Sequence, residues 1–124
     1  MSESNSGAGG ADAGEARISD LDDYQRAAAR TINPALDDAQ RMLDAACGLA
    51  EESGEILGHV RKHLMQGRPL DRVAVTLELG DALWCLAITA QSLGISLSAI
   101  AAANVAKLQA RHPDGFEAER NVAS

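Results

Sequence analysis

Five carboxylates form two clusters at helical spacing within otherwise apolar sequence. Residues three and four positions apart lie on the same side of an α-helix, so the members of each cluster point together if both segments are helical. Two such helices packed against each other would direct four of the carboxylates into one cavity, with the fifth at its rim. Hard divalent cations prefer a shell of oxygen ligands, which phosphate oxygens can complete. The four are Glu52, Glu55, Glu78 and Asp81, and the fifth is Glu51.

The segment around the second cluster, residues 79–90, has only Asp81 and Thr89 as polar side chains. Such an apolar run is typical of a buried helix. A buried aspartate costs on the order of several kcal/mol or more unless it is paired, hydrogen-bonded or bound to a metal. We therefore do not expect Asp81 to be an idle surface charge.

The first cluster is less informative when taken alone. Glu51 and Glu55 fall roughly opposite an apolar stripe on the same segment, and such a position is typical of a solvated helix face. The stripe consists of Leu49, Ile56, Val60 and Leu64. The evidence for a metal site is the pairing of the two clusters.

A glycine adjoins each cluster, at Gly54 and at Gly80. Glycine inside a helix lowers its stability by about 1 kcal/mol relative to alanine, which packing has to offset. We expect close approach of the two helices at these glycines.

The composition bounds the size and type of the core. With 124 residues and 46% hydrophobic content, the chain suits one small folded domain. It has only one Trp, one Tyr and one Phe, so the core must consist of aliphatic side chains, which suits closely packed helices. A domain this small is short of buried apolar area, and we expect it to form a homodimer or homotetramer.

Charge and the N-terminal sequence restrict the partners and the compartment. A net charge of −7 argues against a nucleic-acid polymer or an anionic membrane as partner, although a metal ion would still allow a small phosphate ligand. The N-terminus lacks the basic-then-apolar pattern of an export signal, and no apolar run is expected to span a membrane. Cys47 and Cys85 lie in apolar segments without CxxC spacing and are interpreted as reduced core residues. These features predict a cytoplasmic protein.

Capping and breaking residues divide the chain into helices. Residues 1–17 are mostly Gly, Ala, Ser and acidic residues, and we expect them to be a disordered tail. Asn33-Pro34, Gly67-Arg68-Pro69 and Gly94 are helix-ending signals. The sequence predicts an all-α fold, a four-helix bundle, with helices over about 19–31, 37–65, 71–93 and 96–112. The expected N-caps include Ser19, Asp71 and Ser96.

The last of these helices carries a polar stripe of Asn104, Lys107 and Arg111, at positions i, i+3 and i+7. Cations beside a metal-carboxylate centre can hold a polyphosphate, because Arg makes bidentate contacts and Lys acts as a point charge. Cations are also favoured near a helix C-terminus by the helix dipole, so a solvated face explains the same pattern. The spacing alone leaves both interpretations open.

Four segments stand in the order of a known family's motifs, namely Gly48–Glu55 (GLAEESGE), Glu78–Asp81 (ELGD), Asn104–Lys107 and Arg111–Phe116 (RHPDGF). Over roughly residues 20–117 the chain resembles the MazG-like nucleoside triphosphate pyrophosphohydrolases of the all-α NTP pyrophosphatase superfamily. The EExxE and ExxD motifs, with 22 residues between them, are the most specific part of this resemblance. It implies a helical domain at 18–117, followed by a tail at 118–124. It further implies that the domain splits nucleoside triphosphates into monophosphate and pyrophosphate.

The resemblance also implies a cofactor, a partner and residue roles. Mg²⁺ is the expected cofactor, with Mn²⁺ as a substitute, and nucleoside triphosphates are the expected small-molecule partners. The expected role is control or house-cleaning of the nucleotide pool. Tyr24 and Gln25 are similar to part of the family's first helix and receive no role. The implied metal ligands are Glu52, Glu55, Glu78 and Asp81, the implied water-activating residue is Glu51, and the implied substrate-binding residues are Asn104, Lys107 and Arg111.

Other interpretations have less support in the sequence. His59 and His63 form an i, i+4 pair, but the HExxH motif and a third ligand are lacking, so a solvated helix face is favoured over a zinc site. GxSxG, Walker and GxGxxG motifs are lacking as well. Trp84 would either stack on a base or pack in the core, and its apolar surroundings favour the core. The alternatives to an enzyme are a non-catalytic helical oligomer that binds nucleotide or metal, and a bundle with an unused acidic face.

Overall fold

The computed structural model describes residues 18, 20–116 and 118, and this part of the chain is helical without any β-strand. An isolated bridge joins Pro113 and Gly115. The all-α prediction is therefore confirmed. The tails predicted at 1–17 and 118–124 lie outside the described residues, except for residue 118. The helices are α2 (Leu21–Ala29), α3 (Asp38–Gln66), α4 (Arg72–Ser92) and α5 (Leu97–Arg111).

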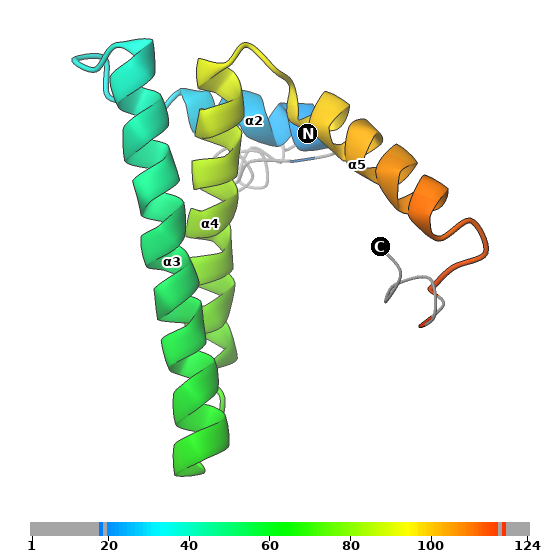
Figure 1. Ribbon diagram of the computed structural model, residues 1–124. Coiled ribbons are helices and arrows are strands. Elements are labelled where there is room, and N and C mark those ends of the chain that lie inside the picture. Colours follow the sequence, from blue (N-terminus) through cyan, green and yellow to red (C-terminus); the bar gives the residue numbers. More distant parts are fainter. Residues whose placement is uncertain (1–17, 19, 117, 119–124) are drawn as a thin grey trace, which may run out of the picture.

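The two long helices, α3 and α4, form an antiparallel pair that is the body of the molecule (Figure 1). The short helix α2 packs across α4 near the C-terminal end of α4. After the α4–α5 turn, α5 leads away from the pair and packs mainly against α2. The two helices that carry the acidic clusters thus lie side by side, and α5, which carries the polar stripe, leads away from them.

Local sequence signals set the helix ends. The side chains of Asp71 and Ser96 accept backbone N–H groups of the first turns of α4 and α5, so both predicted caps are confirmed. Gly67 ends α3 with φ 69°, a left-handed conformation that favours glycine. The N-cap of α2 is Asp20, which accepts the Asp23 N–H at 2.8 Å. Ser19 itself lies outside the described residues, and Asp20 takes the capping position because aspartate caps as well as serine and its charge also suits the helix dipole.

The core is small and consists mostly of short side chains, which allows the helices to approach closely. Tyr24, Ile32 and Trp84 pack at its margin. The predicted aliphatic core is therefore observed, with Trp84 half-buried against it. The buried cluster consists of Ala28, Ala45, Ala87, Ile88, Ala90 and Leu97.

One buried polar side chain, Gln25, ties α2 to the α4–α5 turn. Its Nε2 donates to the carbonyl oxygens of Ala87 and Ile95 at 3.4 and 3.0 Å, and its Oε1 accepts the N–H of Leu97 at 2.9 Å. Next to it, Asp22 accepts the N–H and the hydroxyl of Ser98 at 3.0 and 2.6 Å. These contacts, between residues more than 60 positions apart, set the direction in which α5 leaves the helix pair.

The expectation that residues 79–90 form a buried helix is met on one face only, where Cys85, Ala87, Ile88 and Ala90 are buried. Only one face of α4 is covered, while Val73, Leu77 and Leu79 are 72%, 63% and 53% exposed. α4 is also long and apolar enough to cross a membrane by length and composition, contrary to the sequence-based expectation. Core helices of soluble proteins pass the same test, and α4 carries Glu78 and Asp81 in its interior.

Candidate metal centre

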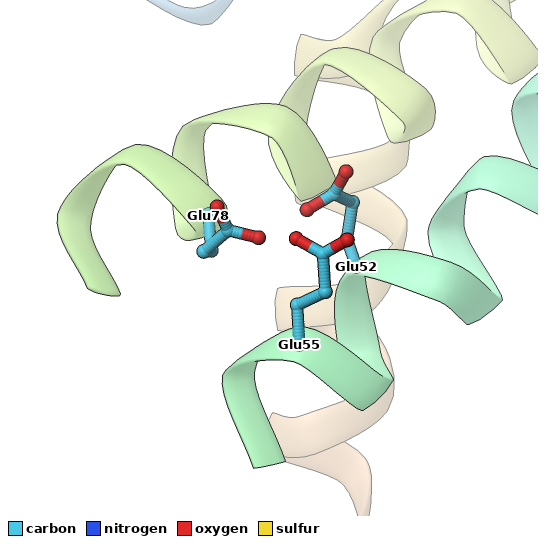
Figure 2. Close-up of side chains that lie close together, drawn as sticks. All are labelled: Glu52, Glu55 and Glu78. Carbon is cyan, nitrogen blue, oxygen red and sulfur yellow. The ribbon is translucent and has the colours of Figure 1, made fainter. Parts of the chain in front are cut away.

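Three carboxylates from two helices converge in the middle of the α3–α4 pair. Glu52 and Glu55 come from successive turns of α3, and Glu78 comes from α4 (Figure 2). One oxygen from each lies within 4.8 Å of those of the other two. Figure 2 shows the three side chains pointing toward one another across the gap between the helices. Glu52 and Glu55 therefore lie together, as their helical spacing predicts, and the packing of α3 against α4 brings Glu78 to them.

The environment of this carboxylate cluster suits a cation. Glu52 and Glu78 are half-buried, and the Oε2 atom of each is buried without a hydrogen-bond partner among the residues that the structure describes. The Glu78 carboxylate raises the pKa of Glu55 above its usual value, because it accepts a hydrogen bond from the protonated form of Glu55 and because its negative charge repels the ionised form. Buried oxygens without donors, and like charges held together, are costly unless a positive charge binds them. The donor set of carboxylate oxygens fits a hard divalent cation.

A cavity of about 240 Å³ adjoins the cluster, and Glu52 belongs to both. Further carboxylates on its wall are Asp44, Glu51 and Asp81. Asp44 was missed by sequence reasoning, because it lies outside the two clusters. It lies seven and eight positions before Glu51 and Glu52, which places it on the same face of α3, so the helical period could have found it.

Asp81 lies in this cavity and outside the three-carboxylate cluster. It is exposed in the single chain, so the expectation of a buried aspartate is wrong there, because the solvent face of α4 is uncovered. The negative charge of Asp81 nevertheless contributes to the raised pKa of Glu55. Glu51 is also exposed and lines the same cavity.

Gly48 and Cys85 also line the cavity. A Cβ built on Gly48 would lie 2.9 Å from Cys85 Sγ, so the close helix approach occurs at Gly48. Gly54 and Gly80, where the sequence predicted it, have no atom within 4 Å of such a Cβ. Burial, and then the charges of surrounding carboxylates with Glu52 first among them, raises the pKa of the Cys85 thiol. Cys85 is a buried free thiol as predicted, whereas Cys47 is free but exposed.

The polar stripe of α5 is not brought to the carboxylates within one chain. Asn104, Lys107 and Arg111 are all exposed, and α5 points away from the α3–α4 pair (Figure 1). Asn104 lines a separate, largely apolar groove of about 500 Å³ between α4 and α5. The single chain therefore contains the proposed metal ligands and the proposed phosphate-binding residues in different places.

The histidines are not part of the carboxylate cluster. His63 Nδ1 lies 2.6 Å from the carbonyl oxygen of Arg68, where it closes the C-terminal end of α3. Within the described part of the chain, the side chains grouped as potential metal ligands are glutamates alone.

Fold and site together define a class: an all-α protein in which two packed helices present a carboxylate cluster of the kind that binds divalent cations. Residues 40–116 match the family model of the MazG nucleotide pyrophosphohydrolase domain. The match covers more than half of the chain, and the protein belongs to this family. Comparison with curated proteins and with solved structures gives no significant match. Membership supports a nucleotide pyrophosphohydrolase, a hydrolase whose substrates are nucleotides.

Proposed function

We propose that the protein hydrolyses nucleoside triphosphates to nucleoside monophosphates and pyrophosphate, with Mg²⁺ held by Glu52, Glu55, Glu78 and Asp81. The observation that carries this proposal is the convergence of Glu52, Glu55 and Glu78, two of which bring buried oxygens without partners. Asp81 lines the adjoining cavity and would complete the ligand set from its open side. Mn²⁺ would substitute, because it accepts the same oxygen ligands.

The chain's own groups then have separate tasks. The cavity beside the carboxylate cluster would receive the phosphates, whose oxygens are ligands that Mg²⁺ accepts together with carboxylates. When bound, Mg²⁺ supplies charge neutralisation and polarisation of the phosphoryl group. Glu51, on the wall of the same cavity, accepts a proton from the attacking water at its carboxylate. Lys107 and Arg111 bind the phosphate oxygens and compensate the charge of the leaving pyrophosphate, and Asn104 contacts phosphate or sugar.

Because α5 points away from the carboxylates of its own chain, we infer that its cations complete the site of a second copy. Exposed apolar side chains support association: Leu57 and Leu64 on α3 are 65% and 70% exposed, and Leu77 on α4 is exposed as well. A homodimer or homotetramer would cover these faces. Association would also supply the buried area that one small chain lacks.

The cellular role that we propose is control or house-cleaning of the nucleotide pool in the cytoplasm. The net charge of −7 supports a small phosphate ligand held through a cation, and disfavours a nucleic-acid polymer. In addition, the α4 helix carries ionisable groups in its interior, which supports a soluble protein over a membrane-spanning one.

The test is an incubation of the purified protein with a panel of NTPs, dNTPs, and oxidised and deaminated analogues in the presence of Mg²⁺. Pyrophosphate and orthophosphate are separated, and a chelator serves as control. We expect monophosphate and pyrophosphate from at least one substrate, and no product with chelator. Absence of product from the whole panel, while nucleotide still raises the melting temperature, would favour a non-catalytic nucleotide- or metal-binding oligomer.

A further inference from the structure

A second cavity, of about 90 Å³, adjoins the carboxylate cavity at the turn between α2 and α3. Asp44 and Trp84 line both cavities, so the two are neighbours. The smaller one has apolar walls contributed by Ile32, Leu36 and Ile88. An aromatic side chain and aliphatic walls next to a phosphate-sized acidic cavity would suit a flat ring attached to a phosphate chain.

The indole of Trp84 is fixed at the boundary between the cavities. Its Nε1–H donates to the Thr31 hydroxyl at 2.7 Å, and that hydroxyl donates to the carbonyl oxygen of Ala28 at 2.7 Å. Both polar groups are therefore used within the protein. Trp84 and Thr31 therefore contribute cavity wall, which is aromatic at Trp84, and no free hydrogen-bond donor for a ligand.

Two other groups on the lining of the small cavity, one buried and one exposed, are hydrogen-bond donors without a partner among the described residues. Arg41 Nε is buried and lacks a hydrogen bond within the described residues, while Arg41 Nη1 pairs with Asp38 Oδ1 at 3.2 Å. The Asn33 Oδ1 accepts the N–H of Ala35 at 2.9 Å, which leaves the Nδ2 group of Asn33 to donate. A buried donor without an acceptor is costly, so a ligand that supplies an acceptor to Arg41 Nε gains on binding, whereas the exposed Asn33 exchanges water for the ligand.

We propose that this cavity is a base-selecting subsite that favours a pyrimidine with two carbonyl oxygens, the chemistry of uracil and thymine. A small cavity lined by Trp84 and aliphatic side chains beside polar ones suits a single ring, and two donors match two carbonyl acceptors. Cytosine would turn an amino group toward a donor, and adenine has no carbonyl. The proposal rests on the proposed function, in that the carboxylate cavity holds the phosphates of the same nucleotide.

The two residues proposed to select the base lie outside the motifs that carry the family resemblance. Asn33 lies before the matched region, which begins at residue 40, and Arg41 is its second residue. Asn33 lies in the α2–α3 turn and Arg41 in the first turn of α3, about three turns before Glu52, so both are proposed specificity-determining residues outside the acidic segments. Changing either one should alter the choice of base without removing the carboxylates.

The experiment uses Trp84, the single tryptophan of the chain, as a fluorescence probe of the cavity. The full-length protein is titrated with UMP and with AMP in the presence of Mg²⁺. We expect UMP to change the fluorescence with a Kd about tenfold lower than that of AMP, which corresponds to the loss of about one good hydrogen bond. Equal Kd values, or no response to either monophosphate, would overturn the proposal.

Two conservative variants test the donors separately. Arg41→Lys keeps the charge and removes Nε, and Asn33→Asp keeps the acceptor for the Ala35 N–H and removes Nδ2. Each should abolish most of the tenfold preference for UMP and leave the Kd for AMP unchanged, while Arg61→Lys, at an exposed site on α3, serves as the matched control. A preference retained in both variants contradicts the proposal, and if one variant fails to fold, the other still decides.

Hydrolysis is measured in parallel with UTP and ATP, so that the two proposals can fail separately. Pyrophosphate release at equal kcat/KM from both substrates would overturn the base subsite and leave the proposed function intact. Selective binding of UMP without cleavage of any triphosphate would refute the proposed function and leave the base subsite intact.

Discussion

Gly48 on α3 faces Cys85 on α4 so closely that a Cβ on Gly48 would lie 2.9 Å from Cys85 Sγ. Both residues line the cavity beside the carboxylate cluster. The glycine therefore allows the two helices to come close together at the cavity beside the carboxylate cluster. A side chain at this position would have to push the helices, and with them the cavity walls, apart.

Gly48→Ala should destabilise the protein by about 1 kcal/mol, because overpacking costs about 1–3 kcal/mol and alanine recovers about 1 kcal/mol of helix propensity. Gly58→Ala is the matched control on the same helix, since a Cβ there meets no atom within 4 Å. Gly58→Ala should be stabilising by about 0.5–1 kcal/mol. Denaturant unfolding measures the free energy change of each variant. In a Cys85→Ala background, which lacks the Sγ atom, Gly48→Ala should become stabilising. Equal effects of the two alanines in the native background would show that the contact does not constrain the helices.

Gln25 makes a second kind of contact, a buried set of hydrogen bonds to backbone groups of Ala87, Ile95 and Leu97. Gln25→Met keeps the approximate volume but leaves these groups without a partner, and we expect a loss of about 2 kcal/mol or more. Gln91→Met, at an exposed site on α4, should change the free energy of unfolding by less than about 0.5 kcal/mol. Equal free energies of unfolding of the two variants would mean that the α4–α5 turn is held by other contacts.

The contact between Asp22 and Ser98 predicts a dependence of stability on pH. The hydroxyl and the N–H of Ser98 donate to Asp22 and hold the pKa of Asp22 below its ordinary value of 3.8. A carboxyl with a lowered folded-state pKa contributes stability above the unfolded value and loses it as the pH falls through the folded value. Asp22→Asn should therefore flatten the decline of unfolding free energy below pH 3.8. Asp114→Asn, at an exposed site, is the control, and an unchanged decline in Asp22→Asn would contradict the assignment.

Subunit mixing tests whether α5 serves a second copy. Glu55→Gln and Lys107→Ala should each be inactive alone. If the cations act across the interface, a mixed dimer contains one intact site, and an equal mixture regains about a quarter of the wild-type activity. A mixture of Glu55→Gln with Asp81→Asn should regain none, because both changes fall in the carboxylate set of one chain. Failure of the first mixture to recover activity, with subunit exchange verified, would place Lys107 at its own chain's site.

Local features of the fold could be predicted from the sequence, because each depends on neighbours within one or two turns. Asp71 and Ser96 cap helices as expected, and the period of the helix brings Glu52 and Glu55 together. The partnership with Glu78 required only that two apolar helices pack.

Other features depend on contacts between distant segments. The direction of α5 is set by Gln25 and Asp22, whose partners lie more than 60 residues away. The position of Asp44 on the cavity wall depends on which face of α3 meets α4. The exposure of Asp81 shows that an apolar run alone does not establish which side of a helix is covered.

The central claim is that the carboxylate cluster binds the metal ion that supports pyrophosphohydrolysis. Its most direct test is the rate of pyrophosphate formation at saturating Mg²⁺ by Glu55→Gln and Glu78→Gln, with Gln91→Met, at an exposed site on α4, as the control. Each glutamine variant should retain its helical content and oligomeric state and lose activity by about 100-fold or more, because a ligand to the charge-neutralising cation is gone. Turnover within about twofold of wild type in both variants would contradict the assignment of the site, since ordinary surface substitutions have effects of that size.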